Sequence, residues 1–309
     1  MASRFELTIL GTSSASPTSR RFPTAQVLNV SERLFLIDCG EGTQIQLRKY
    51  HIRFQRINHI FISHLHGDHF FGLMGLISSL HLLGRQKKLT IYSPKGLQDI
   101  VELQLSYTGT ILSYAIEWVE LNPDKPGLIY EDSQVEVHSI RLYHRIACCG
   151  FLFREKEKPY SLIKEKLQEL NIPMTMYHQL KRGENLVLAD GTKILNSEIT
   201  RQRAEPRSYA YCSDTRFDLR VADAVRKVDL LYHEATFLHE LLDRAEKTAH
   251  TTALEAGIIA KTAQVGKLII GHYSVRYKDV APLLAEAQSQ FQDTQLSEEG
   301  MTLPVGNWS

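Results

Sequence analysis

Three histidines and an aspartate lie within one six-residue stretch of the chain, namely His64, His66, Asp68 and His69. They directly follow the apolar run 57–62, which predicts a buried strand that brings polar side chains to the edge of its sheet. In an extended segment, residues two apart point the same way, so His64 and His66 are placed to bind one ion together. Gly67 lets the chain bend, so that Asp68 and His69 turn toward a second ion. Imidazole and carboxylate donors suit Zn²⁺, and the cluster therefore predicts a metal site.

Three further polar residues stand at the ends of predicted strands and are candidates to complete this site: His144, Asp214 and His272. Two metal ions need about three protein ligands each and a shared oxygen between them. A carboxylate has two oxygens, so Asp214 fits the bridging position, and His144 and His272 fit the remaining nitrogen positions. Each of the three taken alone is also explained as an ordinary polar residue at a strand end. We expect the histidines without such context to be surface or packing residues, namely His51, His59, His81, His138, His178 and His239.

Composition indicates an ordinary globular protein. The chain has 309 residues, of which 43% are hydrophobic and 23% are charged, and this is enough material for a large α/β domain. No apolar stretch approaches the roughly 18 residues of a membrane span, and Glu6 interrupts the first apolar run, unlike a signal peptide. Four cysteines do not form a disulfide framework, so we expect a cytoplasmic protein with reduced thiols. A net charge of +1 neither indicates nor excludes a nucleic-acid partner.

Strand-like and helix-like segments alternate along most of the chain. The apolar patterns predict strands over 5–10, 25–29, 34–37, 57–62, 89–92, 115–121, 134–142, 150–153, 207–212, 229–232 and 267–270. They predict helices over 70–83, 160–170, 222–227, 252–264 and 280–291, and we expect the polar tail after the last helix to be frayed. Polar residues repeatedly follow strand ends, which is where sites gather in α/β proteins.

Composition changes over residues 154–207, which are rich in Lys and Arg and poor in large apolar side chains. Turn-forming residues separate short segments there, and the stretch reads as an arm inserted into the main domain. A long decorated surface loop would show the same composition, but loops beyond about 15 residues usually have a function.

The motifs of the chain resemble those of a known family. Ser63-His-Leu-His-Gly-Asp-His69 is the signature of the metallo-β-lactamase superfamily. Within that superfamily, four more stretches resemble ribonuclease Z, the family of transfer-RNA 3′-processing endoribonucleases: Asp38-Cys-Gly-Glu-Gly-Thr-Gln44, His233-Glu-Ala-Thr-Phe237, His250-Thr-Thr252 and Gly271-His-Tyr-Ser-Val-Arg-Tyr277. The resemblance covers nearly the whole chain.

The resemblance implies a single domain over 1–309 with a four-layer αββα sandwich, a homodimer and two zinc ions per subunit. It assigns one zinc to His64, His66 and His144 and the other to Asp68, His69 and His272, with Asp214 bridging. Residues 154–207 would be the protruding arm that grips the elbow of transfer RNA in the family. The implied reaction removes the 3′ trailer of precursor transfer RNA, leaving a 3′-hydroxyl on the tRNA and a 5′-phosphate on the trailer.

The mechanism expected from these residues needs a base, an acid and phosphate-binding cations. Asp68 is expected to orient the attacking water and accept its proton. His250 is the candidate proton donor to the leaving oxygen with Glu234 orienting it, although both would equally well only support the metal ligands. Arg276 and Lys95 are the candidates for phosphate contacts, followed by Arg20 and Arg21. We also expect Asp38 to accept a hydrogen bond from a ligating imidazole, and His233 to support ligands.

Two other functions are compatible with parts of this pattern. A different di-zinc hydrolase acting on a small ester or phosphodiester would need the same ligands but no inserted arm. A catalytically inactive RNA-binding module would have an incomplete ligand set, yet all the expected ligand residues are present. The donor types do not distinguish Zn²⁺ from Mn²⁺.

Overall fold

The computed structural model describes residues 4–188, 191–201 and 203–306. The chain divides into two compact units. The larger unit comprises Met1–Arg154 and Arg207–Ser309, and the smaller unit is Glu155–Pro206, within the stretch where an inserted arm is predicted. Among the described residues, no helix combines the length and apolar character required to cross a bilayer.

The first sheet of the larger unit has the strand order β18-β1-β2-β3-β4-β5-β6. Its strands are β1 (Phe5–Gly11), β2 (Ala25–Val30), β3 (Arg33–Ile37), β4 (Ile57–Phe61), β5 (Leu89–Pro94), β6 (Ile116–Leu121) and β18 (Thr302–Pro304). β1, β2 and β3 pair antiparallel, whereas β3, β4, β5 and β6 pair parallel. The carboxyl ends of the parallel strands therefore meet at one edge, and the His64–His69 stretch follows β4 at that edge.

The second sheet has the strand order β17-β16-β15-β14-β9-β8-β7. Its strands are β7 (Leu128–Glu131), β8 (Val135–Arg141), β9 (Cys149–Glu155), β14 (Ser208–Cys212), β15 (Leu230–Glu234), β16 (Lys267–Gly271) and β17 (Thr294–Leu296). β14, β15, β16 and β17 are parallel, so the residues that follow β14, β15 and β16 also share an edge. These are the positions of Asp214, of the His-Glu-Ala-Thr motif and of His272.

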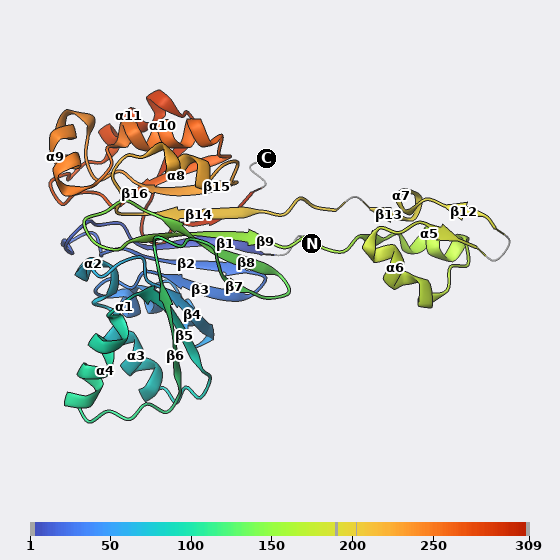
Figure 1. Ribbon diagram of the computed structural model, residues 1–309, viewed down its shortest axis with the longest axis horizontal. Coiled ribbons are helices and arrows are strands. Elements are labelled where there is room, and N and C mark those ends of the chain that lie inside the picture. The colour runs from blue at the N-terminus through green and yellow to red at the C-terminus, as the bar shows by residue number, and fades with distance from the viewer. Residues whose placement is uncertain (1–3, 189–190, 202, 307–309) are drawn as a thin grey trace. The chain divides into compact units, whose positions relative to one another are not determined.

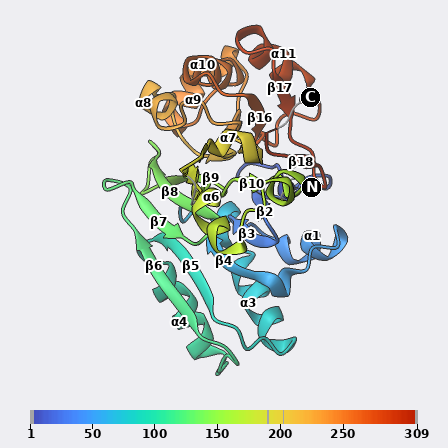
Figure 2. The ribbon, with the colours of Figure 1, turned by 90° about the vertical axis from the view of Figure 1, so that its right-hand side faces the viewer.

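Helices cover the outer face of each sheet, so that the larger unit is an αββα sandwich (Figures 1 and 2). On the first sheet lie α1 (Thr43–Lys49), α2 (Gly67–Phe70), α3 (Leu73–Leu82) and α4 (Leu97–Tyr107), with the 3₁₀ turn η1 (Phe54–Arg56). On the second lie α8 (Leu219–Ala224), α9 (Leu242–Thr248), α10 (Ala253–Ala263) and α11 (Ala281–Gln290), with η3 (His239–Leu241). The predicted fold class is thereby confirmed.

Alternating side chains of the strands build three apolar layers. Phe5, Leu7 and Ile9 of β1 point into the layer between the two sheets, where they meet Phe151 and Tyr211 of the second sheet. Side chains from the opposite faces pack against the helices and form the two outer layers. The period of two along each strand thus decides which residues pack against a sheet and which against a helix.

The described part of the C-terminal tail, residues 292–306, is ordered, and the prediction that it frays is wrong there. β17 pairs with β16, and β18 pairs with β1, so the tail extends both sheets. Val305 is fully buried between them, and Glu299 accepts a hydrogen bond from the Phe22 N–H at 2.5 Å. Main-chain hydrogen bonds to neighbouring strands hold this polar segment in place. Its apolar side chains are too few to produce the alternating pattern that predicts a strand.

Two predicted helices also need correction. The helix predicted over 70–83 begins later, as α3 at Leu73, and Phe70 ends the preceding α2. Between them the Gly72 N–H donates to the Cys39 carbonyl at 2.9 Å and not to a carbonyl of its own helix. The helix predicted over 160–170 is shorter: β10 (Ser161–Leu162) precedes α5 (Lys164–Glu169). The apolar residues of that segment belong first to a strand and then to a helix. Their spacing alone does not show where the strand ends and the helix begins.

The smaller unit has its own apolar core. It contains β10, α5, η2 (Met174–Met176), α6 (Tyr177–Arg182), β11 (Leu186–Val187), β12 (Lys193–Ile194), α7 (Asn196–Ile199) and β13 (Thr200–Arg201). β10 pairs with β13, and β11 pairs with β12. Leu167, Leu180, Leu186 and Ile199 are buried together. The unit is therefore a small folded body and not an irregular loop.

Candidate metal centre

The seven predicted ligands come together at the shared edge of the two sheets. His64 follows β4, His144 follows β8, Asp214 follows β14 and His272 follows β16, while Asp68 and His69 lie in the first turns of α2. Their donor atoms form two groups in which all atoms lie within 4.8 Å of one another. One group is His64, His66, His144 and Asp214, and the other is Asp68, His69 and His272.

Asp214 lies between the two groups and faces each with a different oxygen. Its Oδ2 is 3.4 Å from Nε2 of His64 and 3.7 Å from Nε2 of His144. Its Oδ1 is 3.1 Å from Nε2 of His69 and 3.0 Å from Nε2 of His272. This is the arrangement that a bridging carboxylate requires. A positive φ of 45° at Asp214 accompanies the abrupt turn after β14.

Asp68 belongs to the second group and is held at its edge. Its Oδ2 lies 3.5 Å from Nε2 of His69 and 3.4 Å from Nε2 of His272. The same oxygen accepts a hydrogen bond of 2.7 Å from the Ala15 N–H, in the loop after β1. The Asp68 side chain keeps 8% of its surface exposed, whereas His69 and His272 are fully buried. Asp68 is therefore the member of this group that reaches solvent.

The ring nitrogens that face away from the centre are fixed by hydrogen bonds. Nδ1 of His69 donates to Asp38 at 2.7 Å, the contact expected from the sequence, and Nδ1 of His144 donates to the Ala249 carbonyl at 2.9 Å. Nδ1 of His64 lies 3.0 Å from the Ser63 hydroxyl, which donates its own proton to Asp38. These contacts direct each Nε2 at the centre, and in the neutral form of each ring they favour the tautomer with its proton on Nδ1.

The same logic holds at His272. Its Nδ1 lies 3.0 Å from the Thr236 hydroxyl, which donates its proton to Glu234. Nε2 of His69 and Nε2 of His272 are buried and have no hydrogen-bond partner among the described residues. Buried ring nitrogens without a partner, set around a shared carboxylate, are what a pair of divalent cations would satisfy. The residues thus fit a metal centre.

Charge within the cluster shifts the pKa values of its members in opposite directions. Burial opposes the charged form of His272, but Asp214, Asp68 and Glu234 outweigh it and raise the pKa of His272 to about 10. Burial likewise opposes charging of His69, yet Asp214, Asp68 and Asp38 hold its pKa well above the ordinary value. In the other group burial dominates and lowers the pKa of His144 to about 4. The carboxylates therefore attract positive charge to this centre.

The buried Glu234 and the partly exposed His250 form a pair beside the second group. Nδ1 of His250 lies 3.0 Å from Oε2 of Glu234. The same oxygen accepts a hydrogen bond from the Thr236 hydroxyl, and the other oxygen, Oε1, accepts one from the Thr215 N–H. The predicted orienting contact of Glu234 on His250 is present. The donor atoms of His250, Asp214 and His272 also lie within 4.8 Å of one another. The structure therefore places His250 at the centre but does not decide whether it binds metal or transfers a proton.

The remaining predicted residues are arranged around this cluster. Arg276 is exposed, with its guanidinium 5.4 Å from the ring centroid of Phe237, and that ring lies 6.1 Å from His250. The Arg21 guanidinium lies 5.5 Å from the Tyr273 ring. Lys95 and Arg20 are exposed, and no hydrogen bond or ion pair among the described residues joins Lys95 to the cluster.

The other histidines lie outside the centre. His233 is buried, and its Nδ1 donates to the Glu234 carbonyl at 2.8 Å. His233 therefore stabilises the backbone at Glu234 and contacts no ligand side chain through this bond. His59 packs among Phe35, Tyr92 and Tyr130. Within the described part of the chain, the candidate metal groups include none of the histidines that we expected to be surface or packing residues.

Sequence reasoning missed three residues that hold the ligands. Ser63 and Thr236 act as hydrogen-bonded supports of His64 and His272, and both belong to motifs quoted above, although no role was assigned to them. Tyr211 donates its hydroxyl proton to Asp38 at 2.6 Å from the middle of β14, far from any motif. The first two were detectable as polar members of the motifs, but nothing in the sequence marks Tyr211.

Comparison with known proteins identifies the family. Ribonuclease Z of Bacteroides thetaiotaomicron is 47% identical over 306 residues, which are 99% of this chain and 97% of that protein. Ribonuclease Z of Porphyromonas gingivalis is 44% identical over 301 residues, 97% of this chain and 99% of that protein. The chain belongs to the ribonuclease Z family.

Structural likeness agrees with ribonuclease Z. The crystal structure of the short form of human tRNase Z has a TM-score of 0.70 and 27% identity, covering 98% of this chain and all of that one. A metallo-β-lactamase fold protein of Bacillus subtilis, at 18% identity and a TM-score of 0.68 over 97% of this chain and 99% of that one, shares the fold. The family described as anti-Pycsar protein Apyc1 also includes this chain, since its model matches residues 5–161. That match ends before Asp214 and His272, which the ribonuclease Z match includes.

Proposed function

We propose that this protein is a metal-dependent endoribonuclease that removes the 3′ trailer from precursor transfer RNA. The tRNA would retain a 3′-hydroxyl and the trailer would carry a 5′-phosphate. Full-length identity of 47% to a ribonuclease Z supports the substrate. The observation that carries the proposal is Asp214, whose two oxygens face two separate histidine groups. Such a centre suits hydrolysis of a phosphodiester.

The proposed cofactor is a pair of zinc ions in each subunit. His64, His66 and His144 would hold one, Asp68, His69 and His272 the other, and Asp214 both. When bound, such a pair lowers the pKa of water and places positive charge opposite the phosphate oxygens. Nitrogen and carboxylate donors suit both zinc and Mn²⁺, and metal analysis of the purified protein distinguishes the two ions.

The chain's own residues would supply proton transfer and binding. Asp68 reaches the centre from its exposed edge and would orient the attacking water and take its proton. His250, held by Glu234, would return a proton to the leaving 3′-oxygen. Arg276 and Lys95 would contact phosphates next to the cleaved bond. Residues Glu155–Pro206, with their own folded core, would bind the substrate away from the cleaved bond.

We also propose a cytoplasmic homodimer. The helical layer over the first sheet exposes large apolar side chains, which in a soluble protein mark a contact surface. They are Ile45, Phe71, Leu82, Leu83, Leu103, Tyr107 and Ile111. A second copy of this chain is the proposed occupant. Sedimentation equilibrium of the wild type and of Leu82→Glu tests this, because the charge would shift the dimer toward monomer, and an unchanged mass would contradict this contact surface.

The proposed activity is tested by cleavage of a 3′-extended precursor transfer RNA with the metal content measured in parallel. We expect the wild type to cut once near the end of the acceptor stem and to lose activity with a chelator. Asp68→Asn keeps the shape of the side chain but removes its charge, and we expect a loss of about 10²- to 10⁴-fold in kcat. Asp99→Asn, at an exposed site in α4, serves as the matched control. Full activity after chelation, or no cleavage by a metal-loaded wild type, would refute the proposal.

The alternative is a hydrolase of a small ester or phosphodiester. The match of residues 5–161 to the Apyc1 family covers the His64–His69 motif without requiring the smaller unit. Side-by-side values of kcat/KM for precursor tRNA, bis(p-nitrophenyl) phosphate and a thioester separate the two functions. The endoribonuclease predicts that the precursor has the highest value.

A further inference from the structure

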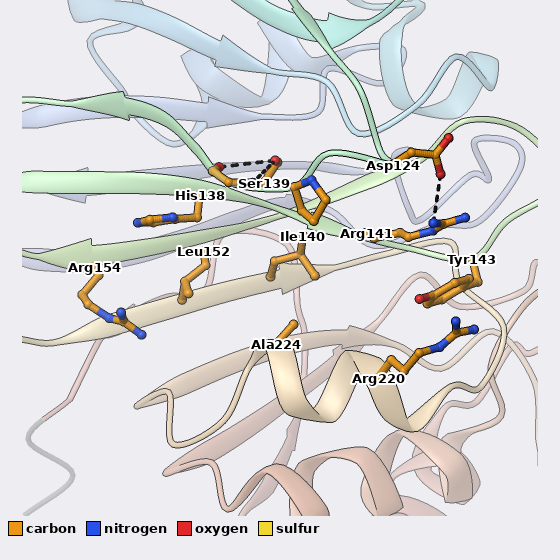
Figure 3. Close-up of a pocket in the computed structure, with 12 residues that line it drawn as sticks. Asp124, His138, Ser139, Ile140, Arg141, Tyr143, Leu152, Arg154, Arg220 and Ala224 are labelled. Carbon is orange, nitrogen blue, oxygen red and sulfur yellow. Dashed lines mark hydrogen bonds and ion pairs between the residues drawn. The ribbon is translucent and has the colours of Figure 1, made fainter.

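A groove rich in arginine adjoins the metal centre along β8 and β9. It consists of two neighbouring cavities of about 510 and 530 Å³ that share Asp124, Arg141 and Tyr143 in their walls. The first cavity includes the ligand candidate His144, and the second extends to Arg154 (Figure 3). We call this surface the arginine groove, after its arginines Arg141, Arg145, Arg154, Arg216 and Arg220.

Acidic neighbours balance the charge of only part of the groove. Arg141 pairs with Asp124 at 2.9 Å, Arg220 with Asp218 at 2.6 Å, and Arg154 lies 4.0 Å from Glu136. Arg145 and Arg216 are exposed, and neither forms an ion pair with any described residue. Two positive charges that form no ion pair with a described residue thus lie in the cavity that contains His144, although the Asp218 carboxylate is near Arg216. Such charges attract phosphate.

The groove also offers flat and apolar surface. Three guanidinium groups lie over the half-buried Tyr143 ring. Their distances to the ring centroid are 4.2 Å for Arg220, 5.2 Å for Arg141 and 5.9 Å for Arg216. Figure 3 shows Tyr143 between Arg141 and Arg220. Ile146 is 38% exposed in the same wall. Apolar surface beside cations suits unpaired RNA, because bases pack against the apolar surface and phosphates against the cations without any reading of the sequence.

The two sides of the centre present cations from different elements. Arg276 follows β16 and lies on the side of His272, together with Phe237 and Arg244. Arg145 and Arg216 follow β8 and β14 and lie on the side of His144. A strand that is cut internally must leave the centre in two directions, and each direction needs its own backbone contacts. The arginine groove is placed to contact the part of the strand that leaves on the side of His144, away from Arg276.

We propose that the arginine groove binds the unpaired RNA strand next to the cleaved phosphate, with Arg145 and Arg216 contacting its phosphates and the exposed Ile146 contacting its bases. This inference rests on the proposed function. The unpaired strand has two sources, the trailer and the acceptor end of the tRNA, which share the same backbone chemistry. Both sources can be distinguished by changing the length of the trailer.

The experiment uses metal-loaded protein and precursors with trailers of one or ten nucleotides. Arg145→Gln and Arg216→Gln are compared with Arg145→Lys, which retains the charge, and with Arg53→Gln, an exposed arginine outside the groove. Hydrolysis of bis(p-nitrophenyl) phosphate and metal content show whether the centre stays intact, because that small ester has no flanking nucleotides. KM, kcat and the dependence of kcat/KM on salt are measured for each variant.

We expect each Gln variant to raise KM roughly tenfold with kcat changed less than twofold, and to lower the slope of log kcat/KM against log salt by about 0.7. Arg145→Lys should retain most of the affinity, and hydrolysis of the small ester should be unchanged. An effect confined to the long trailer identifies the trailer, and an effect with both lengths identifies the acceptor end. Unchanged KM and salt slope in both Gln variants would overturn the groove while leaving the proposed function intact. If the wild type cleaved no precursor, the proposed function itself would fall.

Discussion

At the scale of single residues, the centre depends on how each donor is held. Asp214 divides its oxygens between two groups, and the imidazoles of His64, His69, His144 and His272 are each fixed through Nδ1. Fixed rings present their other nitrogens without needing to reorient when a cation binds, which lowers the cost of binding. The ligand identities were predictable because imidazole and carboxylate groups recur at strand ends. The supports were less predictable, since Tyr211 reaches Asp38 across the sandwich from an otherwise ordinary strand.

Replacing Glu234 with Gln tests the role of the Glu234–His250 pair. Burial opposes charging of His250, but Glu234 outweighs it and raises the pKa of His250 above its ordinary value. A raised pKa keeps the ring protonated to higher pH, and the protonated form is lost as pH rises through that pKa. Without the Glu234 charge, the loss begins at lower pH. We therefore expect the alkaline limb of kcat against pH to move to lower pH, with kcat at pH 7.5 reduced roughly tenfold or more.

The matched control for this prediction is Glu240→Gln, at an exposed site in η3. It should leave both kcat and the pH profile unchanged. An unaltered alkaline limb in Glu234→Gln, combined with reduced metal content, would show that the pair only supports the ligands and does not transfer a proton.

At the scale of elements, parallel strands explain why distant residues meet. β4 of one sheet and β14, β15 and β16 of the other end at the same edge. A motif at the end of any of these strands is therefore brought close to the others. Apolar runs and their polar ends were visible in the sequence, and most strands were predictable from them. β17 and β18 were not, because their stability comes from pairing with β16 and β1 and not from their own composition.

Val305→Ala tests whether the C-terminal tail is part of the fold. Val305 is fully buried next to β18, and the smaller side chain leaves a cavity in the layer between the sheets. We expect a loss of about 2 kcal/mol in the free energy of unfolding, or roughly 4 °C in Tm. Thermal and urea unfolding measure it, with the exposed Thr302→Ala as the control. Equal stability of Val305→Ala and the wild type would mean that the tail does not pack in solution.

At the scale of the whole molecule, two packed sheets and their helices hide every cysteine. All four cysteines are free and buried. Burial raises the pKa of the Cys39 and Cys149 thiols to about 12 and that of Cys148 well above its ordinary value. The thiolate is the reactive form, so these groups are inert in the folded protein. The expectation of reduced thiols fits this burial, although only the fold reveals how complete it is.

Thiol titration with Ellman's reagent at pH 8 checks this arrangement. We expect negligible reaction over an hour in the native protein and reaction of all four thiols in guanidinium chloride, because only global unfolding exposes them. Rapid reaction of one full equivalent in native protein would show that one of the two sheets opens locally.

The smaller unit shows the limit of composition as a guide to fold. Its composition predicted an inserted arm, with a decorated surface loop as the alternative, but it did not predict the core that Leu167, Leu180 and Ile199 build. A core of this size needs few apolar residues, and their spacing spans several short elements. Periodicity over a single window therefore did not detect it.

The central claim is that seven side chains hold two cations that share Asp214. Anomalous diffraction from crystals of the metal-loaded protein tests it most directly. We predict two peaks, one bounded by His64, His66 and His144 and the other by Asp68, His69 and His272, with one oxygen of Asp214 toward each. A single peak, or two peaks that do not share Asp214, would contradict the account.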